Sequence, residues 1–309
     1  MIELYKKHRP KDLDGIVGQH SAVSVLTQMI ENDEIPHTLL LTGPSGVGKT
    51  TIARILRKHL KCNAQDFTEV NIADIRGIDN VRDIRRRMSL CPLHGKTKVW
   101  LLDEAHKLSG DAQNALLKML EDTPKHVYFF LCTTEPGKLI KTIRTRCTEI
   151  ALKPIGEKDL SELVMSVYHK EVPKGHFPEM AFDKIVENSE GSARKALVLL
   201  GSIIHLESEE AMLEAIEKST QEAQAIQLCC LLLNPRSSWQ NISKLLKELE
   251  GEEPEGLRRM VLGYMRSVLL GSGSLAGRAG SIIGIFERNF FDSGNAGLAL
   301  ACWETMGEK

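Results

Sequence analysis

The sequence predicts an α/β protein: a parallel sheet with helices on both faces, followed by a region built only of helices. Short apolar runs alternate with helical patterns between residue 38 and about residue 150. This alternation is typical of parallel strands that are joined by crossover helices. A glycine-rich loop follows the first run, and the strand pattern fades after Pro154. We therefore expect a sheet domain first and helical domains after it.

Four short apolar runs are the predicted strands. They lie at residues 37–42, 68–72, 99–102 and 127–132. A helix between the last two strands carries apolar residues at helical spacing, Ala112, Leu116, Met119 and Leu120. Pro124 follows this pattern, and proline is common just after a helix ends.

The second half of the chain carries helical patterns. Short helices are expected in residues 155–210 and further helices in residues 211–309. One helix has apolar residues on a single face, at Trp239, Ile242, Leu246 and Leu249. We expect Ser237 or Ser238 to cap its start and Gly251 to stop it. The segment 271–274 predicts a flexible connection between two helices.

Length and composition limit the class of protein. A chain of 309 residues is long enough for two or three domains. With 42% hydrophobic and 26% charged residues, a disordered or collagen-like chain is excluded. Seven cysteines without a C-x-x-C pair argue against a zinc ribbon or a disulfide scaffold and fit a reducing cytosol. We find no apolar signal core and no run that is long enough to cross a bilayer, so no membrane partner is expected.

Charge is distributed unevenly along the chain, whose net charge is −1. Residues 1–150 have a net charge of +5, and residues 151–309 have −6. A basic first half favours a polyanionic partner. Solvated surfaces also vary in charge by chance, so both interpretations stay open.

A phosphate-binding loop follows the first predicted strand. Its residues fit the pattern G-x-x-x-x-G-K-[ST] and are Gly43, Pro44, Ser45, Gly46, Val47, Gly48, Lys49 and Thr50. Glycines let main-chain N–H groups approach phosphate oxygens, because no Cβ is in the way. We expect Lys49 to contact the β- and γ-phosphates and Thr50 to offer its hydroxyl to Mg²⁺, at a helix N-terminus that favours anions. The alternative is a glycine turn before an ordinary helix.

Two acidic residues, Asp103 and Glu104, end the third predicted strand. Because a phosphate-binding loop lies upstream, we expect Asp103 to help hold Mg²⁺, through water, and Glu104 to orient and activate the attacking water. His106 follows, and a loop histidine beside a site more often packs or forms hydrogen bonds than binds a metal. The acidic pair therefore predicts nucleotide hydrolysis.

Together these motifs resemble those of AAA+ ATPases, with Asp103-Glu104-Ala105-His106 as the acidic motif. Further segments narrow the resemblance to clamp-loader subunits, both the small subunits of replication factor C and the bacterial gamma/tau subunits. These segments are residues 5–10, 16–19, 71–79, 114–121 with Pro124, 131–136, 144–147 and 191–197. They follow the family order over about residues 1–200, whereas residues 211–309 carry no motif.

The resemblance implies roles for individual residues. Thr133 would be a first sensor that hydrogen-bonds near the γ-phosphate and the water, and Arg194 a second sensor that reaches the nucleotide from a helical lid. Arg146 would be an arginine finger that completes the site of a neighbouring subunit, where charge develops on the transferred phosphoryl group. Arg9 and Val17, in the opening segments, would belong to the residues that bind the nucleotide.

For the whole protein, the resemblance implies an ATPase core at residues 1–152, a helical lid at 153–210 and a helical collar for oligomerisation at 211–309. The ligands would be ATP and Mg²⁺. The partners would be other loader subunits in a homomeric or mixed pentamer, a sliding clamp, and the primer–template DNA that receives the clamp. The expected location is the cytoplasm, in the nucleoid or, for a viral protein, in the host.

The chain departs from the family pattern at a few points. Thr145 replaces a serine, and His106 replaces a more usual aspartate. The zinc module of gamma/tau is missing, with Cys62 alone in that part of the chain, and we expect no polymerase-binding extension after residue 309. Both acidic residues of the hydrolysis motif remain.

A basic helix is the candidate DNA contact. Arg82, Arg85 and Arg86 share one helix face by their spacing, and Arg76 lies just before them. Such charge binds phosphates without reading base sequence, and the resemblance implies that this helix faces the duplex. The alternative is a solvated basic face that nearby aspartates partly neutralise.

Two other functions stay open. A branch-migration helicase would share the ATP chemistry, but it predicts a winged-helix pattern with strands near the C-terminus, where we expect helices. A mainly structural loader subunit would bind ATP without turnover, but the intact Lys49, Asp103 and Glu104 favour hydrolysis.

Overall fold

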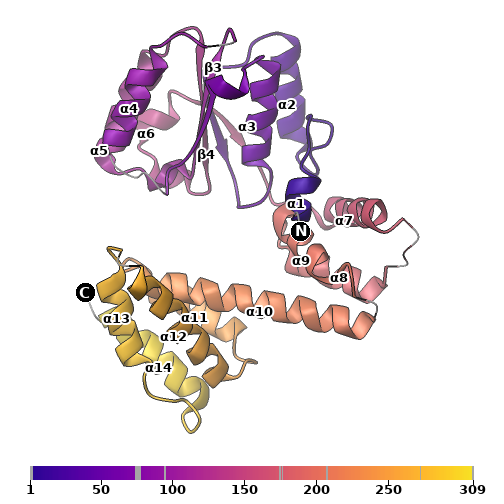
Figure 1. Ribbon diagram of the computed structural model, residues 1–309, viewed down its shortest axis with the longest axis vertical. Coiled ribbons are helices and arrows are strands. Elements are labelled where there is room, and N and C mark those ends of the chain that lie inside the picture. The colour runs from indigo at the N-terminus through magenta and orange to yellow at the C-terminus, as the bar shows by residue number, and fades with distance from the viewer. Residues whose placement is uncertain are drawn as a thin grey trace. The chain divides into compact units, whose positions relative to one another are not determined.

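The computed structural model describes residues 3–73, 78–93, 95–173, 175, 177–206, 208–271 and 273–307. By its internal contacts the chain divides into two compact units, residues 1–209 and 210–309, and each is described by itself (Figure 1). The three-domain division at residues 152 and 210 stays a prediction.

Within the described residues, five strands form one parallel sheet in the first unit. The strands are β1 (Thr38–Thr42), β2 (Phe67–Asn71), β3 (Lys98–Asp103), β4 (Val127–Thr133) and β5 (Thr148–Ala151), in the spatial order β2-β3-β4-β1-β5. Thr42 pairs with Thr133, and Asn71 pairs with Asp103. Because parallel strands end at the same edge, the residues that follow β1, β3 and β4 come together there.

The four predicted strands are confirmed, each within one residue at either end. The fifth strand was not predicted. In β5 only Ile150 is buried, because this strand lies at the edge of the sheet and its other three residues are exposed. A strand with one buried residue leaves no apolar run in the sequence.

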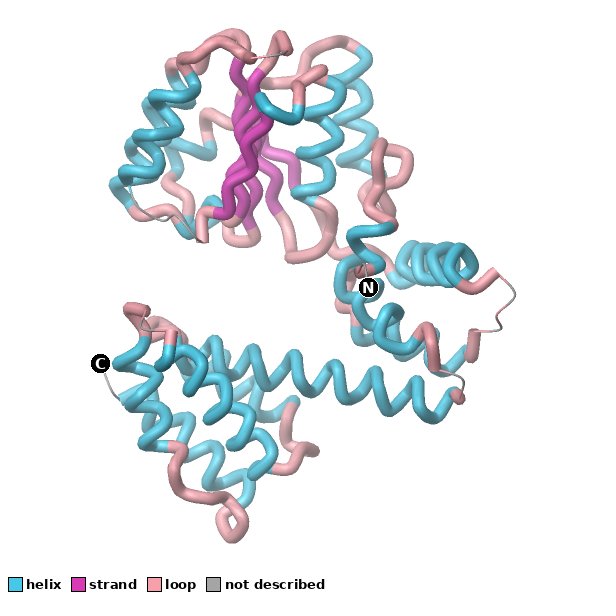
Figure 2. Tube along the Cα trace, viewed as in Figure 1, coloured by secondary structure: helices cyan, strands magenta, loops and turns pink. Residues whose placement is uncertain are grey.

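Helices cover both faces of the sheet, as Figure 2 shows. One face packs against α2 (His20–Glu31) and α3 (Lys49–His59), and the other against α4 (Ile78–Met88), α5 (Gly110–Glu121) and α6 (Lys141–Arg144). Alternate residues of a strand point to opposite faces. In β1, Leu40 packs on the α4–α5 side, whereas Leu39 and Leu41 pack on the α2–α3 side. The strand is buried on both faces, which explains its continuous apolar run.

Three longer helices complete the first unit. They are α7 (Glu157–Glu171), α8 (Glu179–Asn188) and α9 (Ala193–Ile203), and α1 (Leu4–Lys7) packs against α9. Lys7 Nζ lies 2.7 Å from one carboxylate oxygen of Glu171, and His8 Nε2 lies 2.5 Å from the other. The N-terminal segment is therefore attached to α7 and α9. Short 3₁₀ helices occur at η1 (Ala64–Asp66), η2 (Ala105–Lys107) and η3 (Pro136–Lys138).

The second unit packs helices around its own apolar core. Its elements are α10 (Glu209–Leu233), α11 (Trp239–Glu248), α12 (Pro254–Leu270), α13 (Ala276–Ile285) and α14 (Gly294–Gly307). Ile242, Val261 and Phe286 are among the fully buried residues of this core. The Ser238 side chain accepts from Asn241 N and caps α11, as the sequence predicts. Among the described residues, no helix has both the length and the apolar character that spanning a bilayer requires.

A partly buried ion pair fixes the turn after α13 in this unit. The Arg258 guanidinium donates to both oxygens of Glu255 and to the carbonyl of Phe286, and Glu255 also accepts from Phe290 N at 3.1 Å. These hydrogen bonds, first of all those from Arg258, lower the pKa of Glu255 to about 2. One carboxylate therefore joins α12 to the segment between α13 and α14.

Candidate nucleotide site

The loop between β1 and α3 depends on glycines at backbone angles that other residues rarely adopt. Gly43, Gly46 and Gly48 have φ values of +137°, +78° and +112°. A Cβ at Gly43 would lie 2.3 Å from the carbonyl oxygen of Leu152, and a Cβ at Gly46 would lie 2.0 Å from Ser192 Oγ. The loop therefore fits closely between the segment that follows β5 and the start of α9.

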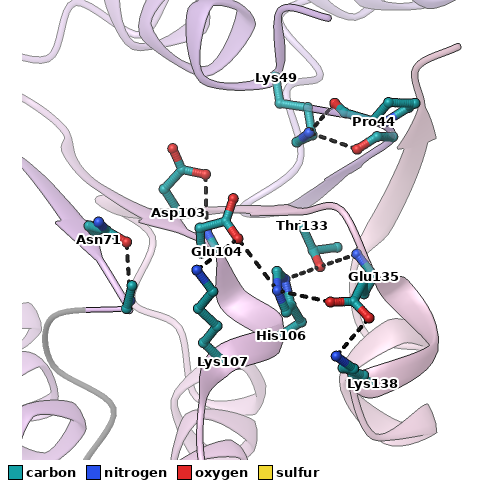
Figure 3. A network of polar contacts seen from close by, with 12 residues as sticks. Pro44, Lys49, Asn71, Asp103, Glu104, His106, Lys107, Thr133, Glu135 and Lys138 are labelled. Atoms are coloured by element: carbon teal, nitrogen blue, oxygen red, sulfur yellow. Dashed lines mark hydrogen bonds and ion pairs between the residues drawn. The ribbon is translucent and has the colours of Figure 1, made fainter. Parts of the chain in front are cut away.

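Lys49 is the first residue of α3, and its side chain folds back over the loop. Its Nζ donates to the carbonyl oxygens of Gly43 at 2.7 Å and of Pro44 at 2.6 Å (Figure 3). Burial lowers the pKa of Lys49, and Asp103 and Glu104 act against this effect. Both acceptors are neutral carbonyls, so an anionic phosphate oxygen would be a stronger partner for this ammonium group.

Thr50 and Asp103 meet at the edge of the sheet. Thr50 Oγ1 donates to Asp103 Oδ2 at 2.8 Å, and Glu104 N donates to Asp103 Oδ1 at 3.0 Å. A hydroxyl and a carboxylate that face each other are hard oxygen ligands of the kind that Mg²⁺ prefers. The described residues hold no cluster of three or more metal-binding side chains. Since Mg²⁺ commonly uses one or two protein ligands with phosphates and water, this pair fits it.

Glu104 adopts a left-handed backbone conformation with φ +57°, which is uncommon for a residue other than glycine. Its Oε2 lies 3.4 Å from His106 Nε2 and 3.4 Å from Lys107 Nζ. Two neighbours on η2 therefore hold the carboxylate in place.

His106 is buried and has a second set of partners. Its Nδ1 lies 3.0 Å from Thr133 Oγ1, and its Nε2 lies 3.4 Å from Glu135 Oε1 as well as near Glu104. Glu135 in turn pairs with Lys138 Nζ at 2.7 Å. Figure 3 shows this network running from the acidic motif to the turn after β4.

A pocket with a cavity volume of about 130 Å³ lies beside these groups. Its lining includes predicted residues from four segments: Arg9, Val17, the loop residues Ser45 to Thr50, Asp103, Glu104 and Arg194. Arg194 N donates to Gly46 O at 3.4 Å, and its guanidinium lies 5.6 Å from the centre of the Tyr5 ring, which also lines the pocket. Arg194 and the phosphate loop therefore share one pocket.

Three residues that were predicted to act at the nucleotide site of their own chain lie outside the lining of this pocket. Gly43 and Pro44 contribute carbonyls beneath Lys49 instead. Thr133 is fully buried, and its hydroxyl contacts His106. The roles of these residues stay predictions.

Arg146 lies away from the pocket. Its carbonyl oxygen accepts from Thr38 Oγ1 at the start of β1, whereas the phosphate loop follows the end of that strand. Its guanidinium pairs with Glu121 Oε1 at 2.5 Å and donates to Thr142 O at 3.1 Å. Arg146 is not part of the lining of the pocket in its own chain, and its role as an arginine finger for a neighbour stays a prediction.

The basic helix is α4. Arg82, Arg85 and Arg86 are exposed on it, and Arg76 lies outside the described residues. Arg87, on the same helix, lies 3.7 Å from Asp83 and has its guanidinium 5.4 Å from the centre of the Trp100 ring.

Sequence reasoning missed Glu135 and left His106 without named partners. The signal for Glu135 was its position two residues after Thr133, at the end of a predicted strand. Its contact with His106 depends on the turn that β4 makes before η3, which the sequence pattern does not reveal.

The sheet order, the phosphate loop after β1 and the acidic pair after β3 define an AAA+ nucleotide-binding protein. Solved structures of RuvB from Thermotoga maritima share this fold. The one described as a Holliday junction branch migration motor superposes with a TM-score of 0.55 and 24% identity, over 68% of this chain and 72% of that chain. At that identity, the likeness concerns the fold alone.

Sequence comparisons narrow the family. The model described as DNA polymerase III, delta subunit, matches residues 63–156, and the Sigma-54 interaction domain model matches residues 16–78. DNA polymerase III subunit gamma from Buchnera aphidicola (subspecies Schizaphis graminum) is 34% identical over 66% of this chain and 61% of its own length. Subunit tau from Bacillus subtilis is 30% identical over 86% of this chain and 51% of its own length. Subunit tau from Escherichia coli is 29% identical over 86% of this chain and 45% of its own length.

The chain belongs to the AAA+ clamp-loader family. It spans less than two thirds of the length of each of these three relatives.

Proposed function

We propose that the protein is an ATP-hydrolysing subunit of a sliding-clamp loader in DNA replication, which opens a ring-shaped clamp and places it on primer–template DNA. One observation carries this proposal: Lys49, the acidic pair and Arg194 line a single pocket in a chain similar to gamma and tau subunits. A branch-migration motor is less well supported. Every regular element in residues 208–271 and 273–307 is a helix, whereas a winged-helix domain includes strands.

In the proposed reaction, each residue of the pocket has its own task. Lys49 exchanges its carbonyl acceptors for oxygens of the β- and γ-phosphates. Thr50 and Asp103 would hold Mg²⁺, which would neutralise negative charge on the phosphates. Glu104 orients the attacking water and accepts its proton. Arg194 brings a second positive charge from the start of α9.

A neighbouring subunit would complete the site. Arg146 of that neighbour exchanges Glu121 for the charge that develops on the transferred phosphoryl group. The proposed assembly is a ring, a pentamer by family analogy, in which each subunit serves the next. Native mass spectrometry of the chain with ATP, with and without candidate partner subunits, distinguishes a homomeric from a mixed assembly.

The function is tested by ATPase and clamp-loading assays on the assembled protein. We expect clamp and primed DNA together to stimulate ATP hydrolysis, and the clamp to become topologically linked to primed circular DNA. Lys49→Ala abolishes both, whereas Lys58→Ala, an exposed lysine of the same helix, leaves them unchanged. If the clamp does not stimulate ATP hydrolysis and hydrolysis instead drives branch migration of a four-way junction, the helicase alternative is supported.

A further inference from the structure

His106 connects the acidic motif to the end of β4. Its side chain is only 5% exposed, and it lies on η2 directly after Glu104 and Ala105. Nδ1 faces Thr133 Oγ1 at 3.0 Å, while Nε2 faces Glu104 and Glu135 at 3.4 Å each (Figure 3). The ring therefore stands between the residue proposed to activate water and the residue expected to sense the γ-phosphate.

The partners of the ring determine which atom donates in each contact. The carboxylates of Glu104 and Glu135 only accept, so Nε2 carries the proton that faces them. Burial lowers the pKa of His106, more than the two carboxylates raise it, and a neutral ring with a proton on Nε2 has an acceptor at Nδ1. Thr133 therefore donates its hydroxyl proton to Nδ1.

The hydroxyl of Thr133 is thus already occupied within the chain. Its single proton goes to His106, and its oxygen accepts from Glu135 N at 3.1 Å. The residue is fully buried and is not part of the lining of the nucleotide pocket. While these contacts hold, no proton of Thr133 is free for a phosphate oxygen.

We infer that Thr133 acts on hydrolysis through His106: it holds the ring so that Nε2–H positions the carboxylate of Glu104. His106 is then a positioning residue, and the contacts run from Thr133 to His106 to Glu104. The inference rests on the proposed function, because it assumes that Glu104 activates the water.

A double-mutant cycle in the assembled complex separates this indirect role from a direct contact with phosphate. Thr133→Val keeps the shape of the side chain and removes the hydroxyl, and His106→Leu removes all three contacts of the ring. We expect each change to lower kcat about tenfold or more, with KM for ATP nearly unchanged. Because the two residues act in one series, the double variant is no slower than His106→Leu alone.

The opposite results overturn the inference. If Thr133 contacts the phosphate directly, the two losses in kcat multiply in the double variant. Thr133→Ser keeps a hydroxyl and should restore most of the rate. A serine variant as slow as the valine variant would contradict the inference that Thr133 acts through its hydrogen bond to His106. Thr123→Val is the matched control, because it removes a hydroxyl that donates to Met119 O, outside the site.

A second measurement does not depend on activity. Spectra of the full chain with ¹⁵N-labelled histidine report which ring nitrogen carries the proton, and His106→Leu identifies the signals of His106. We expect a proton on Nε2 and a shift of the Nδ1 resonance in Thr133→Val, but not in Thr123→Val. A proton on Nδ1 in the parental chain overturns the inference. If the parental complex hydrolyses no ATP, the proposed function fails. The spectrum still shows which nitrogen of His106 carries the proton and whether Nδ1 contacts Thr133.

Discussion

The hydroxyl of Thr38 donates to the main-chain carbonyl of Arg146 at 2.6 Å, at the end of β1 that lies away from the phosphate loop. The same strand leads into Gly43 at its other end. One short central strand therefore connects the nucleotide site of the chain to the arginine that is proposed to serve a neighbour. Within its own chain the main-chain carbonyl of Arg146 binds β1, whereas its side chain is proposed to act on the neighbouring subunit.

We predict that Arg146→Ala leaves the ATP affinity of the isolated chain unchanged and reduces hydrolysis in the assembly by about a thousandfold. Hydrolysis falls because the pocket of the neighbouring subunit loses a positive charge. A nucleotide-binding assay on the isolated chain measures the affinity, and single-turnover kinetics on the assembly measure the rate of hydrolysis. Arg144→Ala is the matched control, because Arg144 pairs with Glu149 in its own chain at 3.3 Å. If the isolated Arg146→Ala chain loses ATP binding to the same extent as the assembly loses hydrolysis, Arg146 acts within its own chain.

Mixed assemblies provide a second check on Arg146. Subunits that carry Lys49→Ala still supply an arginine to their neighbours, and subunits that carry Arg146→Ala still bind ATP. Mixing the two kinds should restore hydrolysis at interfaces where an intact pocket meets an intact arginine. If hydrolysis does not recover at any mixing ratio, the prediction that Arg146 of one subunit serves the pocket of the next is contradicted.

Glu104→Gln should keep ATP binding and lose hydrolysis. Glutamine has nearly the same shape but cannot accept a proton from water, so we expect the turnover rate to fall about a hundredfold or more. Titration calorimetry with ATP and steady-state ATPase assays measure the two effects separately. Glu162→Gln, an exposed glutamate of α7, is the control, and parental turnover in Glu104→Gln would remove Glu104 from its proposed role.

The basic face of α4 should contribute to DNA binding without reading base sequence. We expect Arg82→Glu/Arg85→Glu to weaken binding to primed duplexes of every sequence, and to reduce the slope of log affinity against log salt by about 0.9 per lost contact. DNA-stimulated ATPase should fall, while basal ATPase and assembly persist. Lys244→Glu/Lys247→Glu, a matched reversal on exposed positions of α11, serves as the control.

Unchanged affinity and an unchanged salt slope would make the α4 arginines ordinary solvated residues. Lys107 and Lys138 would then be further candidates, together with Lys141. The first two already pair with Glu104 and Glu135, so DNA phosphates would have to compete with those carboxylates.

The second unit should lose stability in acid through Glu255. Its pKa is about 2 in the folded chain, against an ordinary value of 4.5. The stabilisation is therefore complete above about pH 4.5 and is lost as the pH falls toward 2. Glu255→Gln lowers the free energy of unfolding at pH 7 and flattens its dependence on pH between 5 and 2.

Denaturant unfolding followed by tryptophan fluorescence tests this prediction, because Trp239 and Trp303 lie in the second unit with ring centres 5.0 Å apart. Glu222→Gln, an exposed glutamate of α10, is the control. If Glu255→Gln shows the parental pH dependence, another carboxylate must carry the acid sensitivity.

The sheet was largely predictable because its central strands are buried on both faces. Leu39 to Leu41 and Val99 to Leu102 leave continuous apolar runs that mark strands. The edge strand β5 leaves no such run, since Ile150 alone is buried. The second unit has helical periodicity but no motif, so the sequence indicated its class and not the packing of its helices.

The site was predictable where the chemistry requires a particular local sequence. The glycines, Lys49, Thr50 and the acidic pair belong to two short segments, and the structure places them together. Contacts between distant segments were not predictable. The hydrogen bond from Thr133 to His106 and the pairing of Arg146 with Glu121 depend on how turns direct side chains in three dimensions.

The pocket takes its lining from five segments, the first near Tyr5 and the last ending at Leu197. A ribosome makes these segments in order, so the phosphate loop exists well before the arginine side of the pocket does. A nascent chain that stops before Ala193 contains the glycines and both acids but lacks Arg194 and the helix that presents it. Because domains generally fold as units during synthesis, we expect the chain to bind ATP only when its first unit is complete, and not in its partial forms.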